Sequence, residues 1–83
     1  MANKVCSYIL IDVEKEKLDK IYPALKLDEN VVFCDYTIGN HSIVLFVQDS
    51  FYSGIDNFIE EKILPLEGIL KIKKFPVVNL YEM

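Results

Sequence analysis

Two segments of this chain are apolar at consecutive positions, and they constrain its fold more than any other feature. The first contains Tyr8-Ile9-Leu10-Ile11, and the second is Ile43-Val44-Leu45-Phe46-Val47. A strand with one face in water alternates apolar and polar residues, whereas a continuous apolar run is expected where both faces of a sheet are covered. Both segments are therefore predicted to be central strands of a sheet with no wet face.

The rest of the chain predicts a β-α-β-β-α-β order. Strands are expected over residues 4–13, 31–38, 42–47 and 69–81. Apolar residues at helical spacing lie between them, at Leu18, Ile21, Tyr22 and Leu25 and again at Ile55, Phe58, Ile59 and Ile63. This order predicts an α+β, ferredoxin-like sandwich, with a four-stranded antiparallel sheet and two helices on one face. Residues 1–83 are expected to form a single domain.

Residues that favour turns or interrupt regular structure predict where the helices and strands begin and end. Pro23 should kink or end the first helix near Tyr22, because proline removes a helical hydrogen bond. Asp49 or Ser50 is expected to cap the second helix, and Pro65 to end it. The segment 39–41 reads as a tight hairpin. Pro76 predicts that the last strand is an edge strand, interrupted or bulged at that point.

Two short helices can cover only one face of this sheet. The other face must meet something else, and a second copy of the same sheet is the simplest candidate. A hydrophobic content of 52% with a mean hydropathy of +0.22 is high for an acidic chain of 83 residues. The sequence therefore predicts at least a homodimer that forms through the face without helices.

The net charge and the cysteine positions limit the kinds of partner and bound metal that can be expected. The net charge is −4, the pI is near 4.8, and the nine basic residues are all lysines, which disfavours direct binding to nucleic acid or to anionic membranes. No apolar stretch reaches the length of a membrane span, so a cytoplasmic location is expected. Cys6 and Cys34 fall on strands that are not neighbours in this topology, so we expect neither a disulfide nor a metal site.

Several functional classes of protein share this topology, but this chain lacks residues that each of those functions needs. An RNA-binding domain needs basic and aromatic residues on the third strand, where Phe46 is the sole aromatic. A metal carrier needs paired cysteines in the first loop, which instead reads Asp12-Val13-Glu14-Lys15. An acylphosphatase needs an arginine, and an ACT domain usually has a Pro-Gly pair before its first helix.

A closer resemblance rests on residues spread over nearly the whole chain. These are Gly39, the apolar strand 43–47, Asp49, the helix positions Ile55, Phe58, Ile59 and Ile63, and Leu66-Glu67-Gly68-Ile69. Their spacing resembles the effector-binding and oligomerisation (RAM) domain of the Lrp/AsnC family. Because Met1 lies close to the first strand, the chain looks like the stand-alone form of that domain, without a helix-turn-helix.

The resemblance implies a dimer of facing sheets, octameric or decameric rings, and small effectors, often amino acids, bound between dimers. Its effector cleft would be lined by Gly39, Asn40, His41, Ser42, Ile72 and Lys74. Ser42 stands where the family commonly has an aspartate, and Ile72 and Lys74 stand where threonines are common. The same residues can equally be a plain hairpin turn and a solvated edge strand.

These features predict a non-enzymatic transcription-regulation module that oligomerises and binds an amino acid or related metabolite. Co-assembly with a DNA-binding Lrp/AsnC relative is a further expectation. One alternative is a purely structural oligomerising adaptor with a vestigial pocket. Another is a dimeric α/β-barrel enzyme, whose cavity between sheets would be lined by Ser7, Asp12 and Ser42. No cofactor, metal or catalytic residue is predicted.

Overall fold

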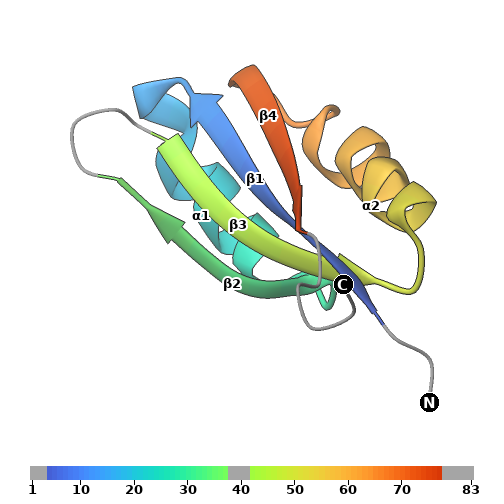
Figure 1. Cartoon of the computed structure of the whole chain (residues 1–83). Helices are drawn as coiled ribbons and strands as arrows, with labels where there is room; N and C mark the ends of the chain where they lie inside the picture. Colours follow the sequence, from blue (N-terminus) through green and yellow to red (C-terminus); the bar gives the residue numbers. More distant parts are fainter. Residues whose placement is uncertain (1–3, 38–41, 78–83) are drawn as a thin grey trace.

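A computed structural model describes residues 4–37 and 42–77, which form a four-stranded antiparallel sheet with two helices on one face (Figure 1). In chain order, the elements are β1 (Val5–Val13), the 3-10 turn η1 (Lys15–Lys17), α1 (Leu18–Lys26), β2 (Val31–Tyr36), β3 (Ser42–Asp49), α2 (Tyr52–Phe58), the π-helical turn η2 (Ile59–Ile63) and β4 (Ile69–Val77). The strand order is β2-β3-β1-β4. The predicted ferredoxin-like α+β fold is confirmed.

The two strands with continuous apolar runs, β1 and β3, lie at the centre of the sheet. Alternate side chains of these strands point toward the helices and are almost fully buried. The core consists of Ile9, Ile11, Val13, Ile43, Leu45 and Val47 from the central strands, Cys34 from β2, and Ile21, Leu25, Ile55, Phe58 and Ile63 from the helical segments. The intervening side chains of the same runs point to the other face, as the sequence predicts.

The prediction that α1 ends near Tyr22 is wrong, because the helix continues through Pro23 to Lys26. Pro23 lies on the exposed side of α1, so the carbonyl that loses its helical partner can be solvated. Ile21 and Leu25 flank the proline and are both buried against the sheet. The burial of these two side chains stabilises the helix more than the proline destabilises it.

The start of α2 also differs from the prediction. Its N-cap is Phe51, which makes no side-chain capping bond, so neither Asp49 nor Ser50 is the cap. The Asp49 carboxylate instead accepts a hydrogen bond from the Ser50 amide at 2.6 Å. A Cβ at Gly54 would lie 2.4 Å from this carboxylate, so a larger residue there would displace the Asp49 side chain. The end of the helical segment before Pro65 is confirmed.

β4 is an edge strand, as predicted, but Pro76 does not interrupt it. Pro76 stays in register opposite Ser7, and the shift in register falls between Asp12 and Val13 instead. An edge strand has one side without a neighbour, so it tolerates a residue without an amide proton. β2 ends at Tyr36 rather than at residue 38. Residue 38 and the predicted strand residues 78–81 lie outside the described residues.

The two cysteines occupy different environments, and neither forms a disulfide. β3 separates Cys6 on β1 from Cys34 on β2. Cys34 is buried, and desolvation raises the pKa of its thiol to about 11, with a smaller contribution from the nearby carboxylate of Asp35. At neutral pH Cys34 is therefore a protonated core residue.

Alkylation of the native protein tests this assignment. At pH 8 we expect iodoacetamide to react with Cys34 about 100-fold more slowly than with an ordinary exposed thiol, because a pKa higher by two units lowers the thiolate fraction by that factor. The Cys34 rate should rise about tenfold per pH unit up to about pH 11. Peptide mass spectrometry measures it, with urea-unfolded protein as the control. Rapid modification of Cys34 in folded protein at pH 8 would contradict its burial.

Candidate functional site

One face of the sheet carries no helix, and we call it the open face (Figure 1). Residues paired across antiparallel strands point to the same side of the sheet, so the strand register defines this face. Its members are Phe33 and Asp35 of β2, Ser42, Val44, Phe46 and Gln48 of β3, Cys6, Tyr8, Leu10 and Asp12 of β1, and Lys71, Lys73, Phe75 and Val77 of β4.

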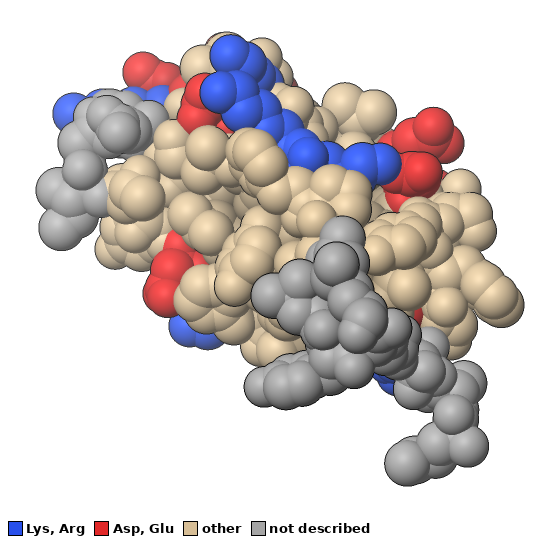
Figure 2. Space-filling view, viewed as in Figure 1, with Lys and Arg blue, Asp and Glu red and all other residues tan. Residues whose placement is uncertain are grey.

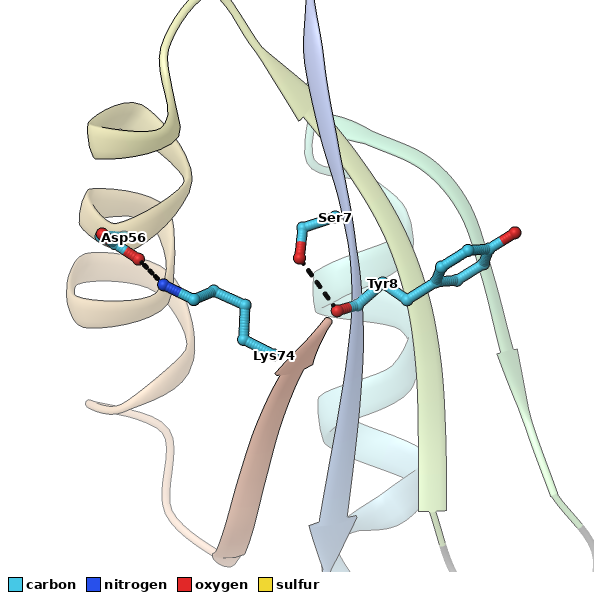
Figure 3. A network of polar contacts seen from close by, with 4 residues as sticks. All are labelled: Ser7, Tyr8, Asp56 and Lys74. Carbon is cyan, nitrogen blue, oxygen red and sulfur yellow. Dashed lines mark hydrogen bonds and ion pairs between the residues drawn. The ribbon is translucent and has the colours of Figure 1, made fainter. Parts of the chain in front are cut away.

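An aromatic row crosses the whole open face. Phe33, Phe46, Tyr8 and Phe75 are paired in succession across β2, β3, β1 and β4. The ring centroids of Tyr8 and Phe46 are 4.8 Å apart. Tyr8 is nevertheless 46% exposed and Phe75 is 51% exposed. In Figure 3 the Tyr8 side chain points away from both helices. A largely exposed aromatic row of this kind is typical of interaction surfaces.

Charged residues lie only around the margins of the open face. The row next to the aromatic one consists of Asp35, Val44, Leu10 and Lys73, so its charges stand on the two edge strands and its centre is aliphatic. Figure 2 shows a broad uncharged surface with a band of lysine atoms along one side. Depletion of charge at the centre is typical of protein interfaces.

At one end of the open face, Ser42 and Asp12 form a polar pair. The Ser42 hydroxyl donates a hydrogen bond of 2.6 Å to Asp12 Oδ1, and Ser42 is buried. Lys71 lies opposite Asp12 on β4. A carboxylate of the neighbouring strand therefore lies beside the hydroxyl at position 42. Sequence inspection did not predict this contact, because only the register between β1 and β3 brings the two residues together.

The structure does not gather the other predicted site residues around Ser42. Ile72 and Lys74 lie opposite Ile11 and Ile9, so they point to the helix-covered side of the sheet. Ile72 packs against the core there, and the Lys74 ammonium forms an ion pair with Asp56 of α2 (Figure 3). Gly39, Asn40 and His41 lie outside the described residues.

The groups expected for an enzyme cavity are also divided between the two faces. Ser7 is fully buried on the helix side and donates a hydrogen bond of 3.0 Å to the Tyr8 carbonyl (Figure 3). It therefore cannot line a cavity between two open faces, although Asp12 and Ser42 can. Within residues 4–37 and 42–77, no three His, Cys, Asp or Glu residues cluster as a metal site would require.

Neither helix of the described segments has the length and apolar character that crossing a membrane would take.

In comparisons with known proteins, only solved structures match this chain. No protein-family model matches the sequence, and no curated protein does. Among solved structures, TTHA0845 of Thermus thermophilus matches with a TM-score of 0.84 and 18% identity, over 93% of this chain and 96% of that one. The transcriptional regulatory protein PF0864 of Pyrococcus furiosus, a member of the AsnC family, matches with a TM-score of 0.81 and 22% identity, over 92% of this chain and 52% of that one.

A third match involves a bound amino acid. The transcriptional regulator NMB0573 of Neisseria meningitidis, solved as a complex with L-Met, matches with a TM-score of 0.79 and 13% identity, over 92% of this chain and 51% of that one. The chain thus corresponds to nearly all of the Thermus protein and to about half of each regulator. It has the fold that the resemblance to the Lrp/AsnC RAM domain predicts.

Proposed function

We propose that this chain is a non-enzymatic regulatory module that dimerises through its open face and binds a small effector between subunits. The observation that carries the proposal is the aromatic row, which leaves large apolar side chains in water on an otherwise well-packed protomer. Burying such a face against a second copy gains about 25 cal/mol for each Å² removed from water. In this proposal the protein acts in the cytoplasm and assembles further into octameric or decameric rings.

The effector in this proposal is an amino acid or a related metabolite. Support comes from the shared fold with a regulator that was solved with L-Met. It also comes from Asp12, whose carboxylate can balance the charge of an ammonium group beside Ser42. The proposed cleft combines residues 39–41 and Ser42 with Ile72 and Lys74. Because one sheet holds Ser42 and Lys74 on opposite faces, a cleft containing both must draw them from different subunits.

The regulatory role in this proposal is to modulate transcription by joining the oligomer of a DNA-binding Lrp/AsnC relative. Its support is that the chain matches about half of two transcriptional regulators. A shared interface would let this chain alter the assembly of such a regulator without contacting DNA itself.

A structural adaptor is the second candidate, and two contacts favour it. Lys74 is already paired with Asp56, and the Ser42 hydroxyl is already bonded to Asp12. A ligand would have to compete with these internal contacts. In an adaptor the same pairs would serve only to fix the margins of the sheet.

Substitution at the centre of the open face tests the dimer. Leu10→Asp should raise the dimer dissociation constant at least about 100-fold, because it places an unpaired carboxylate in the interface. The matched control is Leu27→Asp, since Leu27 is 86% exposed and follows α1, on the other side of the sheet. Sedimentation velocity measures both, and circular dichroism verifies folding. Equal association of the two variants would rule out the open face as the interface.

Calorimetry tests the effector. Titration with the twenty amino acids and common carboxylates should give saturable heat with at least one of them. Asp12→Asn keeps an acceptor for Ser42 but removes the charge, so it should weaken binding of an amine-bearing ligand about tenfold. Asp19→Asn is the control for an exposed carboxylate on the helix side of the sheet. If the whole panel gives no heat, the adaptor is the better description.

A further inference from the structure

In the row next to the aromatic one, the two charges of the open face stand at opposite ends and have opposite signs. Asp35 lies on the edge strand β2 and Lys73 on the opposite edge strand β4, in the same row of the sheet. Both side chains are exposed, and in the described part of the chain neither takes part in an ion pair. By contrast, the adjacent Lys74 points to the helix side and is paired with Asp56. This row thus has an acidic end and a basic end with an apolar centre between them.

Two copies that meet through this face must be related by a two-fold axis lying between the sheets. If the axis runs along the strands, β2 of one copy lies over β4 of the other. If the axis runs across the strands, β2 lies over β2 and β4 lies over β4. The strand order β2-β3-β1-β4 therefore makes the two arrangements chemically different.

With the axis along the strands, every row faces the same row of the other copy. Asp35 then faces the partner's Lys73, and Phe33 faces the partner's Phe75. Phe46 likewise faces the partner's Tyr8 at the centre of the aromatic row. Opposite charges meet at both ends of the charged row and aromatic rings meet in the row beside it, so these two rows are self-complementary.

With the axis across the strands, the contacts are unfavourable. An axis centred on the charged row sets Asp35 against the partner's Asp35 and Lys73 against the partner's Lys73, and like charges repel. An axis centred between the charged and aromatic rows sets Asp35 against the partner's Phe33. That arrangement desolvates a carboxylate without a partner.

The twist of the sheets does not remove this distinction. Aligned sheets pack about 10 Å apart with their strands about 30° from parallel. The edge strands lie about 7 Å from the midline of a four-stranded sheet, so the rotation displaces them by about one residue. A flexible lysine side chain can cover such a displacement.

Resting on the open-face dimer proposed above, we infer that the two-fold axis runs along the strands and that Asp35 pairs with the partner's Lys73 at both margins. These two pairs set the orientation of the dimer, while the aromatic row supplies the apolar contact. The partner that this surface fits is a second copy of the chain.

Charge reversal tests the orientation. Asp35→Lys and Lys73→Asp should each raise the dimer dissociation constant about tenfold or more at low salt, because two attractive contacts become repulsive. The double variant Asp35→Lys/Lys73→Asp should return to within about threefold of the wild type, since both pairs are restored with reversed sign. Lys20→Asp makes the same charge change at an exposed position of α1 on the helix side, and it should leave the dissociation constant unchanged. Sedimentation equilibrium at two salt concentrations measures all four variants.

The outcomes separate this inference from the proposed dimer. A wild type that stays monomeric at high concentration overturns both. A dimeric wild type in which Lys73→Asp and Lys20→Asp behave alike, or in which the double variant is no better than the singles, overturns the orientation alone. Mixing the two single variants provides the folding control, because folded Asp35→Lys and Lys73→Asp chains should form a heterodimer with both pairs restored.

Discussion

The sheet of this protein has two faces, and the chain provides helices for one of them. The face with α1 and α2 has the usual close-packed core, in which Ile9, Ile11 and Leu45 are fully buried. The other face is built from the remaining side chains of the same strands, which are also apolar at the centre. A small domain buries only about 60% of its unfolded surface, so leaving this face wet would cost a large share of its stabilisation. Covering the open face is the condition on which the rest of the account depends.

The two edges of the sheet are protected, which favours the open face as the surface for the proposed association. β4 carries Lys71, Lys73, Lys74 and Pro76 along its length, residues that discourage pairing with another strand. β2 is irregular between Val31 and Phe33, and its Cys34 carbonyl accepts a hydrogen bond of 3.1 Å from the Tyr22 hydroxyl. Strand addition at either edge would have to remove such features. Packing through the open face uses the exposed apolar surface without disturbing them.

Much of the fold could be predicted from sequence, because hydrophobic periodicity reports how many faces of an element are buried. The continuous runs in β1 and β3 correctly indicated central strands, and the stripe of Ile55, Phe58 and Ile63 correctly indicated the second helix. Pro65 correctly marked the end of the second helical segment and Pro76 an edge strand, but the predicted helix end near Pro23 and the predicted interruption at Pro76 were wrong. Pro23 lies within a helix fixed by its buried neighbours, and Pro76 lies on an edge that does not need its amide. Both outcomes depend on tertiary context, which local propensity does not contain.

The candidate site was less predictable than the fold, because its residues are related by strand register. The resemblance to the Lrp/AsnC domain implied one cleft with both Ser42 and Lys74, but pairing with β1 puts them on opposite faces of the sheet. The same register brings Asp12 to Ser42 and sets Asp35 and Lys73 at opposite margins of one row. A shift of one residue would have exchanged the two faces of β4. No composition or spacing rule fixes that choice.

Hydroxyl-radical footprinting of the wild-type protein tests the central claim most directly, because it reports which side chains water reaches in solution. Tyr8 and Phe75 are 46% and 51% exposed in the single protomer, and Phe51, away from the open face, is 71% exposed. If the open face is covered, Tyr8 and Phe75 will be strongly protected at high protein concentration while Phe51 is modified readily. Modification of all three in proportion to their exposure in the protomer, at every concentration, would contradict the account.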